Sequence, residues 1–260
     1  MSRPLVVGMI PARYASTRLP GKVLLDLAGK SMIQRVYERC QQAELLDEVL
    51  VATDDERVRD AVKAFGGRVE MTGCEHCSGT DRLAEVAGRV DCDIVVNVQG
   101  DEPMIEPEAI DAAVEPFLSD EDMQMGTIAT PIDDLDEHLD PAAVKVVVDS
   151  QGWALYFSRA PIPFFRLPAG EPEPDQPRRH PASGMAPLKH IGLYVYRREM
   201  LLWYAGQEPS RLEQTEGLEQ LRVLEAGRRI HVVTVDYSPI GVDTPGDLQR
   251  VREMLAAEDE

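Results

Sequence analysis

The stretch LVVGMIPARYASTRLPGK, residues 5–22, joins an apolar run to a basic loop near the start of the chain. The run Leu5–Ile10 has the length and the valine content of a buried parallel strand. Its apolar pattern then stops, and proline, glycine, serine and threonine take over, so the chain leaves the sheet as a loop. Arg13, Arg18 and Lys22 lie on this loop, and no acidic residue precedes them. The stretch therefore predicts a buried first strand whose end carries an isolated group of cations.

The chemistry of this basic loop suits a polyphosphate. Arginine offers a bidentate fork to phosphate oxygens, lysine offers a point charge, and Gly21 allows close approach of the backbone. The alternative is a solvated surface loop that happens to be basic. The chain contains neither the G-x-x-x-x-G-K-[ST] phosphate loop nor the G-x-G-x-x-G dinucleotide fingerprint. The pattern favours phosphate binding by a loop of another class.

The composition restricts the partners that we expect. The 260 residues include 46 Asp and Glu against 27 Lys and Arg, for a formal net charge of −19. Such a field repels nucleic acid, so we expect no DNA or RNA partner. No apolar run reaches the ~18–20 residues needed to span a bilayer, and the chain opens directly into a strand rather than a signal peptide. We therefore expect a cytoplasmic protein without membrane insertion, and whether its acidity reflects a salty cytoplasm stays open.

Strands and helices alternate through the first half of the chain. The expected strands are 5–10, 49–52, 69–71 and 93–98, and the expected helices are 31–43, 56–65, one that begins at Ser78, and 107–118. This order implies right-handed crossovers and an α/β fold with a doubly wound, mostly parallel sheet. Ligands bind such sheets outside the carboxyl ends of the strands. The basic loop, Thr53-Asp54 and Gln99-Gly100-Asp101 all fall at such ends.

The second half is less regular and predicts a smaller irregular α+β extension. Its expected strands are 124–130, 144–149, 153–157, 190–196 and 230–235, and its expected helices are 199–205, 215–226 and 244–257. The segment at about 160–187 is too rich in proline and polar residues for regular structure, and we interpret it as a lid or a piece of a subunit interface. Since no internal repeat and no clean linker divide the chain, residues 1–260 are expected to form a single domain.

Two aspartates are candidate metal ligands. Asp101 ends the most apolar strand, where a carboxylate can hold a hard cation that bridges phosphate oxygens. Asp243 lies just before the N-terminus of the last expected helix, where aspartate is often only a dipole or capping residue. For both residues the pattern alone does not decide between a metal ligand and a residue that only caps a turn or a helix. The segment Cys74–Cys77, with His76 inside it, has zinc-like spacing, but no second Cys/His pair follows, so we expect reduced thiols there.

Further motifs occur along nearly the whole chain. They are VATD (51–54), SGTDR (78–82), NVQGDEP (97–103), ALYFSR (154–159), HIGLY (190–194), LEQLR (218–222) and GVDTP (241–245). Together with the basic loop, and in the same order, this set resembles the motifs of the 3-deoxy-manno-octulosonate cytidylyltransferase (CMP-KDO synthetase) family. The resemblance implies a nucleotidyltransferase domain with a Rossmann-like fold, Mg2+ as cofactor and a homodimer. It is weakest in the proline-rich insert.

The resemblance also assigns roles to single residues. The expected catalytic residues are Arg13 and Lys22, which would hold the triphosphate, and Asp101 and Asp243, which would coordinate Mg2+. The expected nucleotide-binding residues are Pro11, Ala12, Arg13, Lys22, Thr53, Asp54, Ser78, Gly79, Arg82 and Asp101. The expected sugar-acid-binding residues are Gln99, Arg159, His190, Tyr194, Glu219 and Gln220. Structural alternatives remain: a capping box at Ser78-x-x-Asp81, a core histidine at position 190 and a structural ion pair at Arg159.

The expected reaction needs no protein nucleophile, and no Ser-His-Asp or Cys-His arrangement is evident. The anomeric 2-hydroxyl of 3-deoxy-manno-octulosonate would attack the α-phosphorus of CTP in line and displace pyrophosphate, giving the CMP-activated sugar used for lipopolysaccharide. Arg159 would pair with the sugar carboxylate. The alternatives are a cytidylyltransferase for sialate or the 8-amino octulosonate analogue, and a nucleotide-binding regulatory protein without turnover. The exact sugar acid, the preferred divalent metal and the role of the insert stay open.

Overall fold

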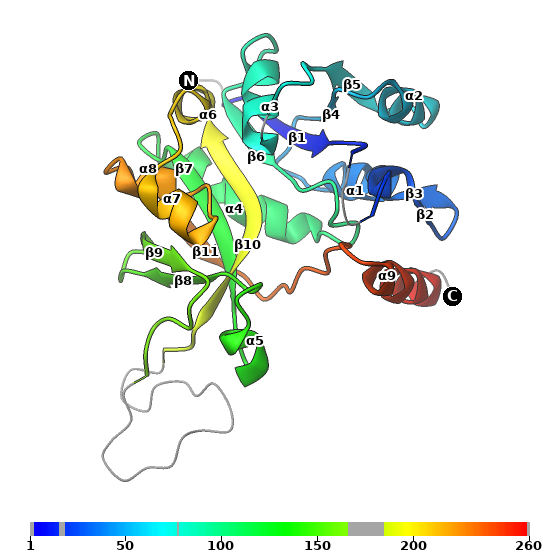
Figure 1. Cartoon of the computed structure of the whole chain (residues 1–260). Coiled ribbons are helices and arrows are strands. Elements are labelled where there is room, and N and C mark those ends of the chain that lie inside the picture. The colour runs from blue at the N-terminus through cyan, green and yellow to red at the C-terminus, as the bar shows by residue number, and fades with distance from the viewer. Residues whose placement is uncertain (1–2, 16–18, 77, 166–184, 259–260) are drawn as a thin grey trace. The chain divides into compact units, whose positions relative to one another are not determined.

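The computed structural model describes residues 3–15, 19–76, 78–165 and 185–258 (Figure 1). The chain divides into two compact units, which are described separately below. Unit 1 comprises Met1–Met123, Leu193–Gly206 and Ser238–Glu260, and unit 2 comprises Gln124–Gly192 and Gln207–Tyr237. Three elements of the sequence analysis lie outside the described residues: Arg18, Cys77 and residues 166–184 of the proline-rich insert. The single domain stays a prediction.

The sheet of unit 1 is parallel except at one edge. Its strands are β1 (Val6–Ala12), β4 (Glu48–Thr53), β5 (Arg68–Met71), β6 (Ile94–Asn97) and the part of β10 (Leu188–Arg197) from Leu193 on. β1 lies between β4 and β6 and pairs in parallel with both, and β4 pairs in parallel with β5. β10 pairs with β6 in the antiparallel direction. This order confirms the expected doubly wound, mostly parallel sheet.

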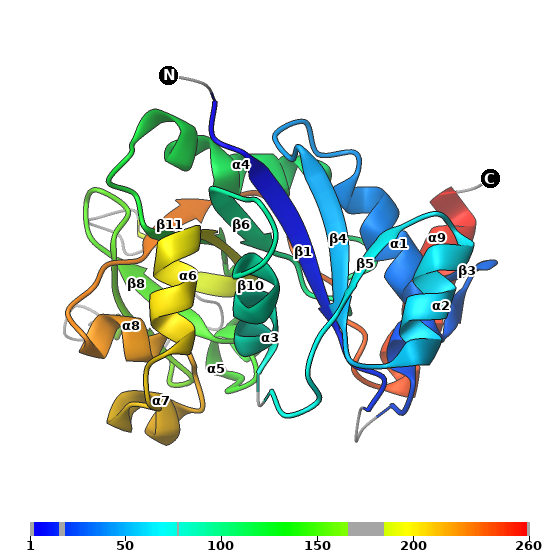
Figure 2. The ribbon, with the colours of Figure 1, turned by 90° about the horizontal axis from the view of Figure 1, so that it is seen from above.

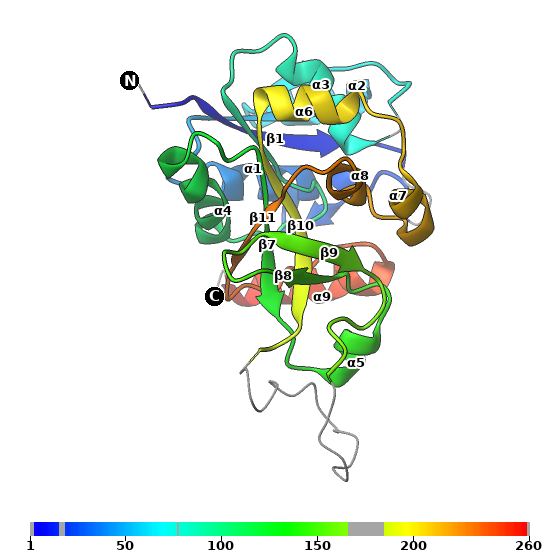
Figure 3. The ribbon, with the colours of Figure 1, turned by 90° about the vertical axis from the view of Figure 1, so that its left-hand side faces the viewer.

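Helices cover both faces of this sheet. The helices of unit 1 are α1 (Met32–Cys40), α2 (Glu56–Ala64), α3 (Gly79–Ala87), α4 (Pro107–Ser119), α6 (Arg198–Ala205) and α9 (Pro245–Glu258). Figure 3 shows α3 and α6 on one side of β1, with α1 and α4 on the other. Because both faces are covered, β1 is apolar throughout, and Val6, Val7, Met9 and Ile10 are fully buried.

The C-terminal helix packs on a small hairpin that follows the basic loop. A 3-10 turn, Lys22–Leu24, leads into β2 (Asp26–Leu27) and β3 (Lys30–Ser31), which the sequence analysis did not predict. Leu27 and Met32 form a buried cluster with the apolar face of α9, and Figures 1 and 2 show α9 beside the hairpin. Arg252 donates to the carbonyl of Asp26 through Nε and Nη2, at 2.9 and 2.7 Å. The end of the chain is thereby held next to the segment that carries Lys22.

Unit 2 combines a parallel strand pair with an antiparallel hairpin. Its strands are β7 (Met125–Pro131), β8 (Lys145–Val148), β9 (Ala154–Ser158), the start of β10, and β11 (His231–Thr234), and its helices are α5 (Leu135–Leu139), α7 (Arg211–Glu216) and α8 (Leu221–Glu225). β7 and β11 are parallel, and β8 and β9 are antiparallel.

The predicted helix 215–226 is wrong. Gly217, at φ +64°, ends α7, and a turn precedes α8. Among the described residues, no helix has both the length and the apolar composition to cross a bilayer.

Candidate active site

The carboxyl ends of β1 and β4 and the segment after β6 come together in unit 1. Ala12 on β1 is the partner of Thr53 on β4, so the two predicted nucleotide-binding strand ends lie side by side. After β6 the chain passes very close to β1, since a Cβ on Gly100 would lie 3.0 Å from the carbonyl oxygen of Pro11. A Cβ on Gly79, at the start of α3, would lie 3.3 Å from the Pro11 side chain. The structure thus brings together four of the predicted nucleotide-binding positions: Pro11, Ala12, Thr53 and Gly79.

The basic loop is closed at its two ends. The Gly21 N–H donates to the carbonyl of Tyr14 at 3.0 Å, and Gly21 has φ +67°, a conformation that favours glycine. The Tyr14 ring lies under the guanidinium of Arg57, with 3.3 Å between the guanidinium carbon and the ring centroid. Lys22 follows this closure directly, so its backbone position is set by contacts within unit 1.

Lys22 bridges the two candidate metal ligands. Its Nζ lies 2.6 Å from Asp101 Oδ2 and 3.0 Å from Asp243 Oδ1, and the backbone N–H of Val242 donates to the carbonyl of Asp101 at 3.0 Å. The Lys22 side chain is 15% exposed. Burial by itself lowers the pKa of Lys22, but the charges and hydrogen bonds of Asp101 and Asp243 outweigh burial and raise the pKa above its usual range. The ammonium is therefore charged at neutral pH.

The donor set around Lys22 fits a hard divalent cation. Asp101 and Asp243 already converge on one positive charge, and their carboxylate oxygens are the ligand type that Mg2+ prefers. Within the part of the chain that the structure describes, no group of three or more His, Cys, Asp or Glu side chains is arranged to hold a metal. Mg2+ commonly binds through one or two carboxylates and completes its shell with water and substrate phosphates. Two carboxylates suit that type of site.

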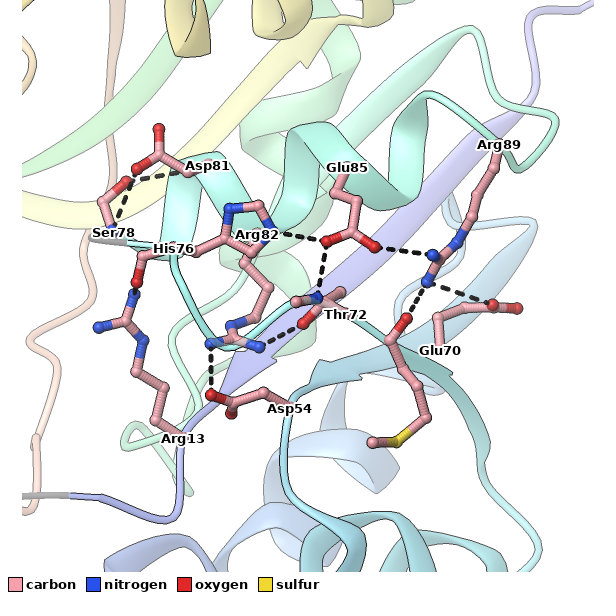
Figure 4. A network of polar contacts seen from close by, with 12 residues as sticks. Arg13, Asp54, Glu70, Thr72, His76, Ser78, Asp81, Arg82, Glu85 and Arg89 are labelled. Atoms are coloured by element: carbon pink, nitrogen blue, oxygen red, sulfur yellow. Dashed lines mark hydrogen bonds and ion pairs between the residues drawn. The ribbon is translucent and has the colours of Figure 1, made fainter.

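Arg82 is a buried cation at the start of α3 (Figure 4). Its side chain is fully buried, donates to Thr72 Oγ1 through Nη1, and places Nη2 3.2 Å from Asp54 Oδ2. Among the described residues its Nε and Nη2 have no hydrogen-bond partner. Buried donors in native proteins are normally bonded, and Nη2 lies within ion-pair distance of Asp54, so Nε is the donor that lacks a partner among the described residues. Ser78 caps α3 by a capping box with Asp81, which is the structural alternative stated for that motif.

The predicted sugar-acid residues divide between the units. In unit 1, Tyr194 is the strand partner of Asn97, and the Gln99 amide donates to Asn97 Oδ1 at 3.5 Å. In unit 2, Arg159 donates through Nε to the carbonyl of Glu216 at 2.7 Å and through Nη1 to that of Pro141 at 2.9 Å.

Arg159 thereby fixes the turn after α7. Glu219, which is exposed, and Gln220, which is 4% exposed, both lie on this turn. The Glu216 carboxylate accepts from the Arg159 backbone N–H at 2.9 Å and from Ser158 Oγ at 2.7 Å. Glu216 was not predicted, because no sequence pattern marks it before the turn is known.

His190 in unit 2 is surrounded by apolar and weakly polar groups. Its ring packs edge-on against Phe157, with 5.0 Å between centroids, and Nε2 lies 3.0 Å from Thr127 Oγ1. Burial lowers the pKa of His190 to about 3. The imidazole is therefore neutral at pH 7, able to hydrogen-bond a hydroxyl group but unable to supply a positive charge to a carboxylate.

The comparisons with known proteins agree with the motifs. Residues 7–230 match the family model described as Cytidylyltransferase. A 3-deoxy-manno-octulosonate cytidylyltransferase of Geotalea uraniireducens (strain Rf4) is 56% identical over 250 residues, which cover 96% of this chain and 98% of that protein. The protein of the same name from Solibacter usitatus (strain Ellin6076) is 51% identical over 252 residues, 97% of this chain and 95% of that one.

A solved structure extends the similarity to three dimensions. CMP:2-keto-3-deoxy-manno-octonic acid synthetase in complex with CTP is similar to this chain with a TM-score of 0.88 and 46% identity, over 98% of this chain and 99% of that chain. The family predicted from the motifs is thereby confirmed. With a model match over most of its length and relatives more than half identical along it, the chain belongs to the cytidylyltransferase family, in the group of the 3-deoxy-manno-octulosonate cytidylyltransferases.

Proposed function

We propose that this nucleotidyltransferase transfers CMP from CTP to the anomeric 2-hydroxyl of 3-deoxy-manno-octulosonate, giving the CMP-activated sugar for lipopolysaccharide and releasing pyrophosphate. The observation that carries this function is the meeting of Lys22, Asp101 and Asp243, where Asp101 follows the glycine that lies against the Pro11 backbone. Such a group of opposite charges is suited to a triphosphate and its counter-cation. The relatives' names support the choice of CTP and of the sugar acid.

Arg13 and Lys22 bind the triphosphate in this proposal. Arg13 lies on the loop after β1 and donates from one edge of its guanidinium to a backbone carbonyl, at 2.6 Å from Nη2 to the His76 oxygen. Among the described residues, the hydrogen bonds of Arg13 leave its other edge available to phosphate oxygens, which a planar fork binds in a bidentate manner. The Lys22 ammonium adds a point charge. Arg82, with buried donors near the strand end, is assigned to the nucleoside together with Asp54.

Asp101 and Asp243 would hold Mg2+. When bound, the ion would neutralise charge on the phosphate oxygens and help to orient the leaving pyrophosphate. Both carboxylates form ion pairs with the Lys22 ammonium, which supports their ability to share one cation. The role of Asp101 and Asp243 is to present two negatively charged oxygens in a fixed arrangement.

The residues assigned to the sugar acid act by hydrogen bonding and charge. In unit 1 these are Gln99 and Tyr194, and in unit 2 they are Arg159, His190, Glu219 and Gln220. Arg159 supplies the positive charge that the sugar carboxylate needs, because His190, with a pKa of about 3, is neutral. We assign no general base to the chain. The substrate hydroxyl attacks the α-phosphorus in line, and the protein contributes positioning and charge stabilisation.

We also propose a homodimer and a cytoplasmic location, both on family resemblance. Large apolar side chains exposed in unit 2 support a subunit contact there: Leu155 is 63% exposed and Phe164 is 88% exposed. Sedimentation at several protein concentrations measures the oligomeric state, and a monomer at all concentrations would contradict the dimer.

The decisive experiment measures pyrophosphate release for several sugar acids, each with the four nucleoside triphosphates. We expect turnover with CTP and 3-deoxy-manno-octulosonate and much less with any other pair. Preference for sialate or the 8-amino analogue would change the substrate and leave the reaction class intact. CTP binding without pyrophosphate release from any pair would instead identify a nucleotide-binding protein without turnover.

A further inference from the structure

The segment 72–76, between β5 and α3, is held by one carboxylate of α3 (Figure 4). Glu85 Oε2 accepts from the backbone N–H of Gly73 at 2.9 Å and lies 2.5 Å from Nε2 of His76. The two contacts tie both the start and the later part of the loop to α3. The His76 side chain is 17% exposed and that of Glu85 30%, so the pair is partly shielded from water.

Glu85 is itself held on the far side from His76. Arg89, which follows the C-terminal end of α3, donates to Glu85 Oε1 at 2.8 Å and also to the carbonyl of Met71. The hydrogen bond to His76 lowers the pKa of Glu85 and outweighs burial, which raises it, so the carboxylate is ionised at neutral pH. The loop is therefore fixed to α3 and to the end of β5 by charged groups that lie away from the strand end at Pro11.

The same loop carries the acceptor that holds Arg13. Nη2 of Arg13 donates to the carbonyl oxygen of His76 at 2.6 Å, and Figure 4 shows the Arg13 side chain directed at that oxygen. Residue 76 thus faces two ways: its imidazole contacts Glu85, and its carbonyl contacts Arg13. A long arginine side chain on a loop has many rotamers, and one bonded edge removes much of that freedom before a ligand arrives.

We propose that Glu85 and His76 are positioning residues for Arg13, which fix the carbonyl of residue 76 and thereby orient the Arg13 guanidinium toward the triphosphate, an inference that rests on the proposed role of Arg13 in binding CTP. Neither residue is assigned any contact with the nucleotide. Their effect is on the affinity for CTP, because an oriented arginine loses less side-chain entropy on binding.

The first test is a double-mutant cycle on the dissociation constant of CTP, measured by titration calorimetry without sugar acid. Glu85→Gln keeps the shape and removes the charge, and we expect CTP affinity to fall about 3- to 10-fold. In an Arg13→Ala background the same substitution should have no further effect, because Arg13 is the only route by which Glu85 acts in this scheme. An equal loss in both backgrounds would reveal a general effect on the fold and overturn the inference.

Glu70→Gln is the matched control. Glu70 lies in the same network, 3.8 Å from Arg89, and is also paired with Arg68, and neither ion pair includes His76. Glu70→Gln removes the same charge as Glu85→Gln, and we expect it to leave the affinity for CTP unchanged. If Glu70→Gln weakens CTP binding as much as Glu85→Gln does, the effect is one of net charge rather than of positioning.

Variants of His76 keep the test decisive if Glu85→Gln folds poorly. His76→Gln retains an N–H donor for Glu85 and should bind CTP close to the wild-type affinity, whereas His76→Phe retains a ring without the donor and should match the loss expected for Glu85→Gln. Wild-type affinity in His76→Phe would refute the positioning role. A wild-type protein that binds no CTP would refute the proposed function instead, so the two failures are distinguishable.

Discussion

Lys22 is the residue on which the charges of the candidate site converge. It lies within ion-pair distance of two carboxylates that come from distant parts of the sequence, and it is the least exposed of the three groups. Its ammonium therefore has two tasks: it keeps Asp101 and Asp243 from repelling each other in the free protein, and it is available to the triphosphate in the proposed function.

Lys22→Ala should destabilise the free protein as well as weaken CTP binding. Removal of the ammonium leaves two neighbouring carboxylates without their cation, and we expect the free energy of unfolding to fall by about 1–3 kcal/mol. Mg2+ should restore much of this loss, because it would bind the same carboxylates. Thermal unfolding with EDTA and with Mg2+ measures both effects. Lys30→Ala, which breaks the more exposed pair with Glu38, is the control and should show no Mg2+ rescue.

Asp101→Asn and Asp243→Asn should each lower kcat by ~10²–10⁴-fold, since each removes charge stabilisation where the phosphoryl group reacts. Groups that act as one unit are strongly non-additive, so the double variant should be little worse than the worse single one. Asp247→Asn is the contrasting variant: Asp247 caps α9 by accepting from the backbone N–H groups of Asp243 and Thr244. It should lower the melting temperature with a smaller effect on kcat. If Asp243→Asn behaves like Asp247→Asn, Asp243 is a helix-terminus residue only.

At the scale of secondary structure, local patterns predicted most elements of unit 1. Ser31 caps α1 and Ser78 caps α3, and the apolar strands occur where their composition placed them. The error at 215–226 has a local cause as well. The apolar spacing of this segment begins only after Gly217, at Leu218, Leu221 and Leu224. Gly217 itself takes a left-handed conformation that ends α7 and separates it from α8.

Gly217→Ala tests this break. Within the described part of the chain, a Cβ on Gly217 would meet only Arg159 Nη2, at 4.0 Å, so the cost comes from φ +64° rather than from crowding. We expect about 1 kcal/mol of destabilisation in chemical unfolding. Gly206→Ala is the control, because Gly206 also ends a helix but at φ −80°, which alanine adopts freely. An equal cost at the two positions would contradict the conformational explanation.

At the scale of the whole molecule, nucleotide binding should be visible as stability. A ligand that binds only the folded state at 100 times its dissociation constant raises the free energy of unfolding by about 2.7 kcal/mol. We expect CTP with Mg2+ to raise the melting temperature and GTP to raise it much less. The net charge of −19 opposes any nucleoside triphosphate, so a stabilising shift requires the local cations of the site. Equal shifts with CTP and GTP would contradict a cytidylyltransferase.

By itself, the sequence determined the alternation of strands and helices in the first half of the chain, the mostly parallel sheet, the cations at the end of the first strand and the family, because apolar periodicity, capping residues and motif spacing are local properties. Only the tertiary structure decided which charges meet. Lys22 contacts Asp101 across 79 residues and Asp243 across 221, and Arg13 reaches the carbonyl of His76 across 63. No local pattern encodes such contacts, since they depend on how β1, β6 and α9 pack and on glycines such as Gly100 that let backbones approach. The physical reason is that a hydrogen bond or an ion pair is set by distances between side chains, and packing alone fixes those distances.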